Sequence, residues 1–312
     1  MAKRPLALVT GANGFVGRHL VDLLQRSGWR VRAALRAPYD GAWDESVVVG
    51  ELCADTPWEA ALDGADYVFH LAARVHVLHE TDADPEAAFT RSNVDGTRAL
   101  AIAAAASDVK RLVFVSTAKV CGETTPRGAP FDDACEPAPQ GPYARSKWAA
   151  ETAIAGSGVA YCILRPPLVY GPGVGANFAA MMRWVERGWW LPLGAICNER
   201  SLLYVGNLCD ALLRAATHPD AQGEHFLVDD GTPLSTPELL RAVAAAARVK
   251  SRLIAVPQWM LAGALRLAGR GAEASRLTGS LAIDSSRIRK KLDWQPPFSR
   301  QDGLRATLAQ NR

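Results

Sequence analysis

Residues 6–17 read Leu-Ala-Leu-Val-Thr-Gly-Ala-Asn-Gly-Phe-Val-Gly, and the amphipathic stretch that begins at Phe15 continues to Ser27. An apolar run, three glycines and an amphipathic run predict a strand, a tight turn and a helix. In such a turn the first glycine permits the bend, the second lets a pyrophosphate approach the backbone, and the third lets the helix pack on the strand. The helix N-terminus adds N–H donors for anionic oxygens. The stretch therefore predicts a dinucleotide-binding turn, with contacts from Gly11, Asn13, Gly14, Phe15, Val16 and Gly17.

Short apolar runs alternate with longer amphipathic stretches through the first half of the chain. Strands are expected at residues 6–10, 30–35, 65–72, 111–116 and 160–165, with helices at 15–27, within 85–106 and at 143–155. This alternation predicts an α/β fold, a Rossmann-type doubly wound parallel sheet. After Pro166 and Pro167 the composition changes to glycine, proline and tryptophan. We expect a nucleotide-binding domain over residues 1–167, to which parts of 200–230 return, and a smaller substrate-binding lobe over 168–312, with helices at 207–217, 236–247 and 257–268.

Charge and composition exclude several classes of function. The 312 residues include 35 Lys and Arg against 32 Asp and Glu, a net charge of +3, which is too even for binding to a nucleic-acid backbone. The uncharged stretch 166–182 contains three prolines, so it is not expected to form a membrane helix. The N-terminus lacks a secretory signal, and the six cysteines lie far apart without a Cys/His cluster. Reduced thiols, no metal site, no membrane partner and a cytoplasmic location are expected.

The end of the second expected strand indicates which dinucleotide binds. An acidic side chain about 20 residues beyond the glycine turn would bind a ribose 2′-hydroxyl. Arg36 stands there instead, and the nearest downstream acid is Asp40. A guanidinium pairs with a 2′-phosphate, so NADP(H) is favoured while NAD(H) stays possible; the alternative is an exposed arginine without this role. Glu51 and Leu52 are expected beneath the adenine.

Tyr143 and Lys147 are four residues apart, so they lie on one face of an expected helix. An unperturbed tyrosine, with a pKa of about 10, is a poor base at neutral pH, but an adjacent cation favours its phenolate form. We therefore predict that Tyr143 moves a proton while Lys147 lowers the pKa of the phenol and binds the nicotinamide ribose. The alternative is a coincidental pair on a helix surface.

With these motifs together, the chain resembles the extended short-chain dehydrogenase/reductases, and among them the NAD-dependent epimerase/dehydratase family. The resemblance extends over nearly the whole chain. Besides the glycine turn and the Tyr-x-x-x-Lys pair, it rests on residues 70–73, 93–97, 115–122, 164–171 and 284–294. Members of the family act on nucleotide sugars, which implies a nucleotide-diphosphate sugar as substrate.

The resemblance also implies roles for individual residues. Thr117 takes the position that hydrogen-bonds the reacting sugar oxygen, with Ser116 as the fallback. Further cofactor contacts are implied for Leu71, Ala72, Ala73, Asn93 and Pro166. The family's contacts to the substrate diphosphate match Asn177, Phe178 and Arg200, with Arg276 as a weaker second arginine.

Three departures from the family pattern bear on the reaction. Cys121 replaces a tyrosine and Leu168 replaces an asparagine that some sugar epimerases carry, so the sugar pocket differs from theirs. Ala118 and Lys119 follow Thr117 where the family's dehydratases carry Asp-Glu, which argues against dehydration.

Hydride transfer at sugar C4 therefore remains, either as 4-keto reduction in surface polysaccharide (O-antigen) sugar biosynthesis, which is favoured, or as UDP-sugar 4-epimerisation with retained NAD. A non-catalytic NADP-binding protein is a third possibility, but such proteins typically lack the Tyr-Lys pair. We also expect a homodimer through the Ala-rich helix before Ala106 and the helix of Tyr143, because the family pairs there.

Overall fold

A parallel seven-stranded sheet forms the centre of the computed structural model, which describes residues 4–75 and 84–310. Each neighbouring pair of strands is parallel. In spatial order the strands are β3 (Glu45–Val48), β2 (Arg30–Leu35), β1 (Leu6–Thr10), β4 (Tyr67–His70), β5 (Arg111–Val115), β6 (Tyr161–Arg165) and β9 (Glu224–Leu227). The predicted doubly wound parallel sheet is confirmed.

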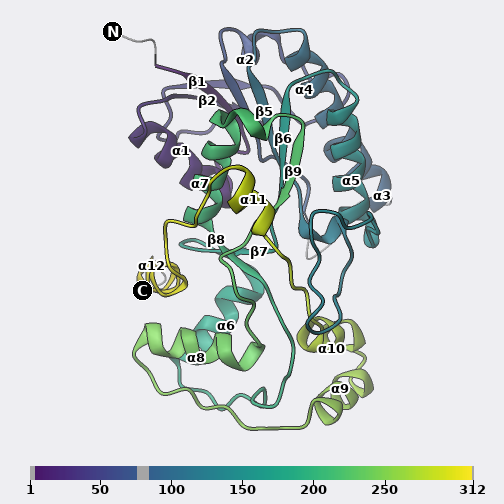
Figure 1. Cartoon of the computed structure of the whole chain (residues 1–312), viewed down its shortest axis with the longest axis vertical. Coiled ribbons are helices and arrows are strands. Elements are labelled where there is room, and N and C mark those ends of the chain that lie inside the picture. Colours follow the sequence, from purple (N-terminus) through teal and green to yellow (C-terminus); the bar gives the residue numbers. More distant parts are fainter. Residues whose placement is uncertain (1–3, 76–83, 311–312) are drawn as a thin grey trace.

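Helices cover both faces of this sheet (Figure 1). On one face α1 (Phe15–Arg26) packs beside α7 (Val205–Thr217), and on the other α4 (Gly96–Ala105) packs beside α5 (Gly141–Ala155). Two clusters of buried apolar residues fill the two interfaces. Shorter segments near the second face are α2 (Glu59–Leu62), α3 (Pro85–Phe89) and a π-helical turn, Thr90–Asp95, that joins α3 to α4.

The smaller C-terminal lobe lies beyond the carboxyl edge of the sheet (Figure 1). It begins with the parallel pair β7 (Leu168–Tyr170) and β8 (Leu202–Tyr204). Its helices are α6 (Ala176–Glu186), α8 (Thr236–Ala247), α9 (Gln258–Leu267) and α10 (Gly271–Thr278). The chain then returns to the sheet at α11 (Ser286–Lys291), which packs against β9, and ends in α12 (Arg300–Gln310), which packs against α8. Within residues 4–75 and 84–310, no helix is both long enough and apolar enough to cross a bilayer.

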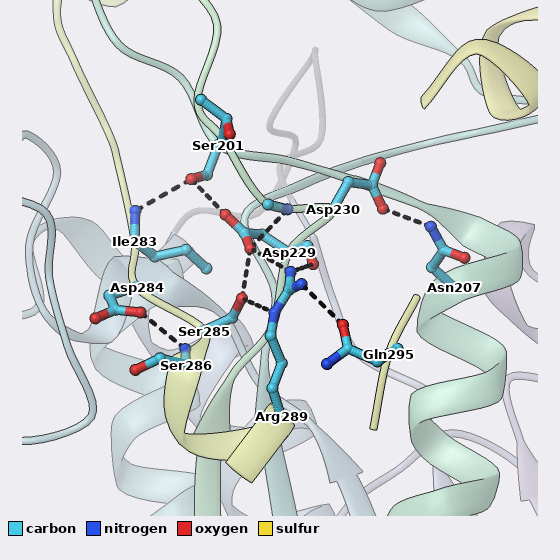
Figure 2. Close-up of polar contacts among 12 residues, drawn as sticks. Ser201, Asn207, Asp229, Asp230, Ile283, Asp284, Ser285, Ser286, Arg289 and Gln295 are labelled. Atoms are coloured by element: carbon cyan, nitrogen blue, oxygen red, sulfur yellow. Dashed lines mark hydrogen bonds and ion pairs between the residues drawn. The ribbon is translucent and has the colours of Figure 1, made fainter. Parts of the chain in front are cut away.

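Two adjacent carboxylates, Asp229 and Asp230, tie the lobe to the sheet (Figure 2). Asp229, which is buried directly after β9, accepts hydrogen bonds from Ser201 Oγ at 2.8 Å and Ser285 Oγ at 2.6 Å. Asp230 accepts from the backbone N–H of Tyr204 and from Asn207 Nδ2 at 2.7 Å. Hydrogen bonds to charged acceptors are the stronger class, so this pair fixes where the returning chain meets the sheet.

One expectation about the cysteines is wrong. Cys121 and Cys135 form a disulfide, although their separation of 14 residues gave no recognisable pairing signal. The intervening loop turns back because Phe131 pairs with Ile283 through backbone hydrogen bonds. The other four, Cys53, Cys162, Cys197 and Cys209, are free thiols.

The glycine at position 17 gives a first prediction. A Cβ at Gly17 would lie 2.0 Å from the carbonyl oxygen of Gly11, whereas a Cβ at Gly263, within α9, would meet nothing within 4 Å. Gly17→Ala is therefore expected to lower the free energy of unfolding by about 1–3 kcal/mol, the usual effect of overpacking. Gly263→Ala, the matched control, is expected to raise it by up to about 1 kcal/mol through helix propensity. Urea denaturation measures both; equal changes would contradict the prediction.

Candidate active site

The glycine turn presents an uncapped helix N-terminus at the sheet edge. Gly11 has a φ of +70°, and a Cβ there would lie 2.9 Å from the backbone nitrogen of Ala72, so the turn excludes other residues. Gly14 caps α1 without a side-chain hydrogen bond, and the first turn contains no acidic residue. Asn13 is exposed beside it. First-turn N–H groups without a side-chain acceptor suit an anionic group such as a pyrophosphate.

A neutral histidine supports the loop that follows β4. Thr10 Oγ1 accepts from the backbone N–H groups of Leu71 and Ala72, so its own proton points to His70 Nδ1 at 2.7 Å. The other ring nitrogen of His70 then donates to Thr97 Oγ1 at 2.8 Å. Burial lowers the pKa of His70 to about 3, so the ring is uncharged. These hydrogen bonds hold the loop of Leu71, Ala72 and Ala73, the predicted cofactor contacts, against the glycine turn.

Asn93 braces this loop against α5. Its Oδ1 accepts from the backbone N–H of Arg74 at 2.7 Å, and its Nδ2 donates to Arg74 O at 2.9 Å and to Ser146 Oγ at 3.0 Å. Asn93 lies in the π-helical turn, a feature frequent at functional sites. The amide thus links the predicted cofactor loop to the helix of Tyr143, an arrangement that makes Asn93 a positioning residue.

The predicted ribose and adenine contacts lie at the ends of β2 and β3. The Arg36 side chain is 77% exposed and its guanidinium lies 3.9 Å from the Glu51 carboxylate, which is similarly exposed. Leu52 is half-buried against Gly96. Exposed ion pairs contribute little to stability, so Arg36 is available to a ligand.

Tyr143 and Lys147 lie on α5 as predicted, but their charge states differ from the prediction. Burial raises the pKa of Tyr143 to about 12, the reverse of the lowering expected from Lys147. Burial lowers the pKa of Lys147 to about 7, against the Coulombic pull of Glu151 in the other direction. The Lys147 ammonium lies 4.1 Å from the centre of the Phe114 ring. Desolvation therefore outweighs the attraction between the two groups, since it penalises the charged form of each.

Glu151 is a site residue that the sequence reasoning missed. It lies four residues after Lys147 on α5, 3% exposed, and accepts two hydrogen bonds from Arg165 (Nη2 to Oε2, 2.6 Å; Nε to Oε1, 3.1 Å). Ser116 Oγ also donates to it. The carboxylate thus joins α5 to the ends of β5 and β6. The available signal was the regular spacing of Tyr143, Lys147 and Glu151 along one helix face.

The two candidate hydroxyls after β5 have different hydrogen-bond partners. Thr117 Oγ1 accepts from Lys119 N–H at 3.3 Å and retains a proton to donate. The Ser116 hydroxyl is buried and donates to Glu151. It therefore holds this carboxylate, which differs from the fallback prediction that it binds the sugar oxygen. The carbonyl of Pro166, at the end of β6, accepts from Ala118 N–H at 2.9 Å and fixes the same turn.

The candidate diphosphate residues do not all face a ligand. Phe178 is buried in α6 and stacks on Tyr170, with ring centres 5.4 Å apart, which places it in the core. Arg200 is half-buried and donates to Gly279 O at 3.2 Å, and burial lowers its pKa. The side chains of Asn177 and Arg276, on α6 and α10, lie outside the described part of the structure. Among the described residues, no three His, Cys, Asp or Glu side chains gather to hold a metal ion.

A model of the NAD dependent epimerase/dehydratase family matches residues 7–229. The chain belongs to this family. It is 39% identical over 306 residues to the UDP-glucose 4-epimerase of Vibrio cholerae, covering 96% of this chain and 93% of that protein. Two solved UDP-glucose 4-epimerases have the same fold. They are that of Thermotoga maritima with UDP-glucose (TM-score 0.75, 23% identity, 98% of both chains) and that of Thermus thermophilus with NAD (TM-score 0.76, 23% identity, 98% of this chain and 99% of that chain). As a family member, the protein is a nicotinamide-dependent oxidoreductase or epimerase.

In this member of the epimerase/dehydratase family, Glu151→Gln tests the buried carboxylate. The variant keeps the side-chain size but leaves Arg165 without a counter-ion, so the free energy of unfolding should fall by about 3–5 kcal/mol. The pKa of Lys147 should also fall, since the carboxylate raises it, and any activity that needs the ammonium should be lost at lower pH than in the wild type.

The matched control is Glu86→Gln, which removes a carboxylate 3.0 Å from Arg145 on the exposed side of α5. This change should cost less than about 1 kcal/mol. Urea denaturation and the pH–rate profile measure the two effects. If Glu151→Gln has the same stability and the same pH–rate profile as the control, Glu151 has no positioning role.

Proposed function

We propose that the protein transfers a hydride to or from C4 of a nucleotide-diphosphate sugar, with 4-keto reduction as the net reaction. The observation that carries this proposal is the gathering of the uncapped glycine turn, Thr117 and the Tyr143–Lys147 pair at one carboxyl edge of the sheet. In open α/β sheets that edge is where ligands bind. The solved structures of the Thermotoga maritima epimerase with UDP-glucose and of the Thermus thermophilus epimerase with NAD support the substrate and cofactor classes.

The nicotinamide cofactor supplies the hydride, and its oxidised ring carries a positive charge. The turn from Gly11 to Gly17 would hold the pyrophosphate, because the first N–H groups of α1 have no side-chain cap. Arg36 would pair with a 2′-phosphate, Glu51 and Leu52 would lie beneath the adenine, and Leu71, Ala72, Ala73 and Pro166 would line the rest of the cofactor site. Asn93 would act at one remove, by holding the loop and Ser146 in place.

Tyr143 and Thr117 would act on the sugar oxygen. In reduction, C4 receives the hydride and its oxygen must receive a proton. A phenol with a pKa of about 12 keeps its proton at neutral pH, which is the state that a general acid requires. Thr117 would donate a hydrogen bond to the same oxygen, and Lys147 would bind the nicotinamide ribose. The protonated Tyr143 can therefore serve as the proton donor for the sugar oxygen.

Epimerisation is the second candidate, and the 39%-identical Vibrio cholerae epimerase favours it. The same residues would then return the hydride to the opposite face of C4. Incubation with a UDP-4-keto sugar and NADPH, followed by cofactor absorbance, tests reduction. Incubation with UDP-glucose and no added cofactor, together with identification of the cofactor released on denaturation, tests epimerisation; retained NAD would favour the second candidate.

We also infer a homodimer through α4 and α5. Small residues on α4 allow close helix approach, and Ile102 presents an exposed apolar side chain there. Static light scattering measures the mass; a monomer at micromolar concentration would contradict this inference.

Tyr143→Phe tests the proton donor. The variant removes only the hydroxyl, so turnover should fall by a factor of about 10²–10⁴ while cofactor affinity is unchanged. Tyr161→Phe, which changes a tyrosine of β6 away from the site, is the control and should retain turnover. In the wild type, the rate of reduction should fall as alkaline pH deprotonates the phenol. Near-full turnover by Tyr143→Phe on every accepted sugar would refute the assignment.

Arg36→Ala tests the choice of cofactor. If the guanidinium pairs with a 2′-phosphate, NADPH binding should weaken by about 1.5–3 kcal/mol, the range for hydrogen bonds to charged groups, while NADH binding hardly changes. Calorimetry with each cofactor gives both affinities, and Arg98→Ala, an exposed arginine of α4, is the control. An equal loss of affinity for both cofactors, or no loss for either, would show that Arg36 does not bind the 2′-phosphate.

A further inference from the structure

The far end of the C-terminal lobe exposes large aromatic and aliphatic side chains. Trp184 lies in the last turn of α6, and Trp189 and Trp190 follow this helix. Trp190 is 65% exposed, and Trp259, in α9, is 75% exposed. Leu267, the last residue of α9, is 93% exposed. The set, called here the lobe-end surface, comprises Trp184, Trp189, Trp190, Ile254, Trp259, Met260 and Leu267. Exposed apolar side chains gathered at one end of a molecule are typical of an interaction site.

Helix α9 packs against α10 on one side, where Leu261 and Leu265 are half-buried, and exposes Trp259, Met260 and Leu267 to solvent. Its sequence is Gln-Trp-Met-Leu-Ala-Gly-Ala-Leu-Arg-Leu, and none of the ten residues is buried. Helix α8 of the same lobe, by contrast, buries Leu239, Leu240 and Val243. Helices in proteins are stabilised mainly by packing of an apolar face, so α9 presents a face that the described chain does not cover.

Backbone hydrogen bonds bring the segment after α6 beside the residues that precede α9. Leu191 N–H donates to Arg252 O at 2.9 Å and Ile254 N–H donates to Leu191 O at 2.9 Å, so the tryptophan segment pairs with the strand-like residues before α9. Cys197 N–H donates to the side chain of Gln258, the first residue of α9, at 3.3 Å. Figure 1 shows the chain between α8 and α9 crossing the end of the molecule that lies away from the sheet.

The same segment concentrates positive charge. Residues 248–270 contain five Lys and Arg residues and no Asp or Glu. The net charge of this segment, +5, exceeds the +3 of the whole chain. Two guanidinium groups lie over exposed rings: Arg252 at 5.7 Å from the centre of Trp190, and Arg187 at 5.8 Å from that of Trp189. Tryptophans flanked by cations are typical of proteins that lie in the interface of a bilayer.

We propose that the lobe-end surface binds peripherally to an anionic lipid bilayer. The tryptophan rings and Leu267 would enter the boundary between headgroups and acyl chains, while the arginine and lysine heads remain among lipid phosphates. Charge favours lipid over a second copy of this chain, because pairing the same face of two copies would bring two strongly positive segments together. The attachment needs no membrane-spanning helix and does not depend on the proposed reaction.

Flotation with lipid vesicles tests the proposal. The purified full chain is mixed at 0.1 M salt with vesicles of phosphatidylcholine and phosphatidylglycerol (3:1), or of phosphatidylcholine alone. The wild type should float with the anionic vesicles, and much less with the neutral ones or in 0.5 M salt, because screening weakens the attraction. Each basic residue near such a surface is worth about a fivefold change in partitioning, so Lys250→Glu with Arg266→Glu should lower it by at least about 25-fold.

Two further variants separate the apolar contribution from the charge. Trp190→Ser with Trp259→Ser should lower partitioning at least tenfold, because both rings lose their place in the interface. The controls are Tyr39→Ser with Val48→Ser, which removes two half-exposed apolar side chains elsewhere, and Arg91→Glu with Lys290→Glu, which makes the same charge change elsewhere. Both controls should float like the wild type, and thermal unfolding should show that every variant is folded.

Three outcomes would overturn the proposal. The first is no flotation of the wild type with the anionic vesicles at 0.1 M salt. The second is equal flotation with anionic and neutral vesicles. The third is a wild type that does not bind vesicles but forms an oligomer in analytical ultracentrifugation, while the tryptophan variant is monomeric. The partner of the lobe-end surface would then be a second copy of the chain.

Discussion

The buried carboxylate of Glu151 is the constraint on which the candidate active site depends. It accepts from Arg165 at the end of β6 and from Ser116 at the end of β5, while its own helix carries Tyr143 and Lys147. A buried ion is costly to desolvate, and it is retained only where its partners satisfy it. Here the partners are the strand ends that also carry Thr117 and Pro166. Glu151 thus ties α5 to both strand ends, alongside the hydrogen bond from Asn93 to Ser146.

The burial that fixes this geometry also sets the charges. The pKa of Lys147 falls to about 7, that of His70 to about 3, and that of Tyr143 rises to about 12, each because the charged form is poorly solvated. His70 is consequently a neutral link between Thr10 and Thr97 rather than a second cation next to Lys147. The site keeps one titrating ammonium near neutrality and a protonated phenol four residues away. The phenol therefore holds its proton at neutral pH, while the ammonium titrates in the physiological range.

The sequence predicted the elements whose signals are local. The strand, glycine turn and helix over residues 6–27 and the helix of Tyr143 and Lys147 are present, because periodicity and glycine geometry act within a few residues. Strand β9 was not predicted, since its four residues pair with β6 about 60 positions earlier in the chain. The Glu151–Arg165 pair and the Cys121–Cys135 disulfide likewise depend on which strands and loops become neighbours.

The wrong direction for the pKa of Tyr143 has a different cause. The spacing of Tyr143 and Lys147 reveals their proximity, and proximity alone predicts a lowered pKa for the phenol. The loss of solvent around the buried Lys147 and the partly buried Tyr143 is a property of the folded chain, and it reverses the result. Phe178 shows the same limit, because an aromatic residue near the start of a lobe helix can face a ligand or the core, and here it stacks on Tyr170.

The two ends of the lobe use apolar residues in opposite ways. Near the sheet, Tyr170, Phe178 and Tyr204 fill a core that Asp230 ties to α7. At the far end, α9 has a comparably apolar sequence and packs against α10, but none of its ten residues is fully buried. A pattern of apolar residues therefore does not distinguish a core helix from a surface helix; only the neighbours do. Because the carboxyl edge of the sheet faces the near end of the lobe (Figure 1), contacts made at the far end would leave the glycine turn and the candidate catalytic side chains open to solvent and substrate.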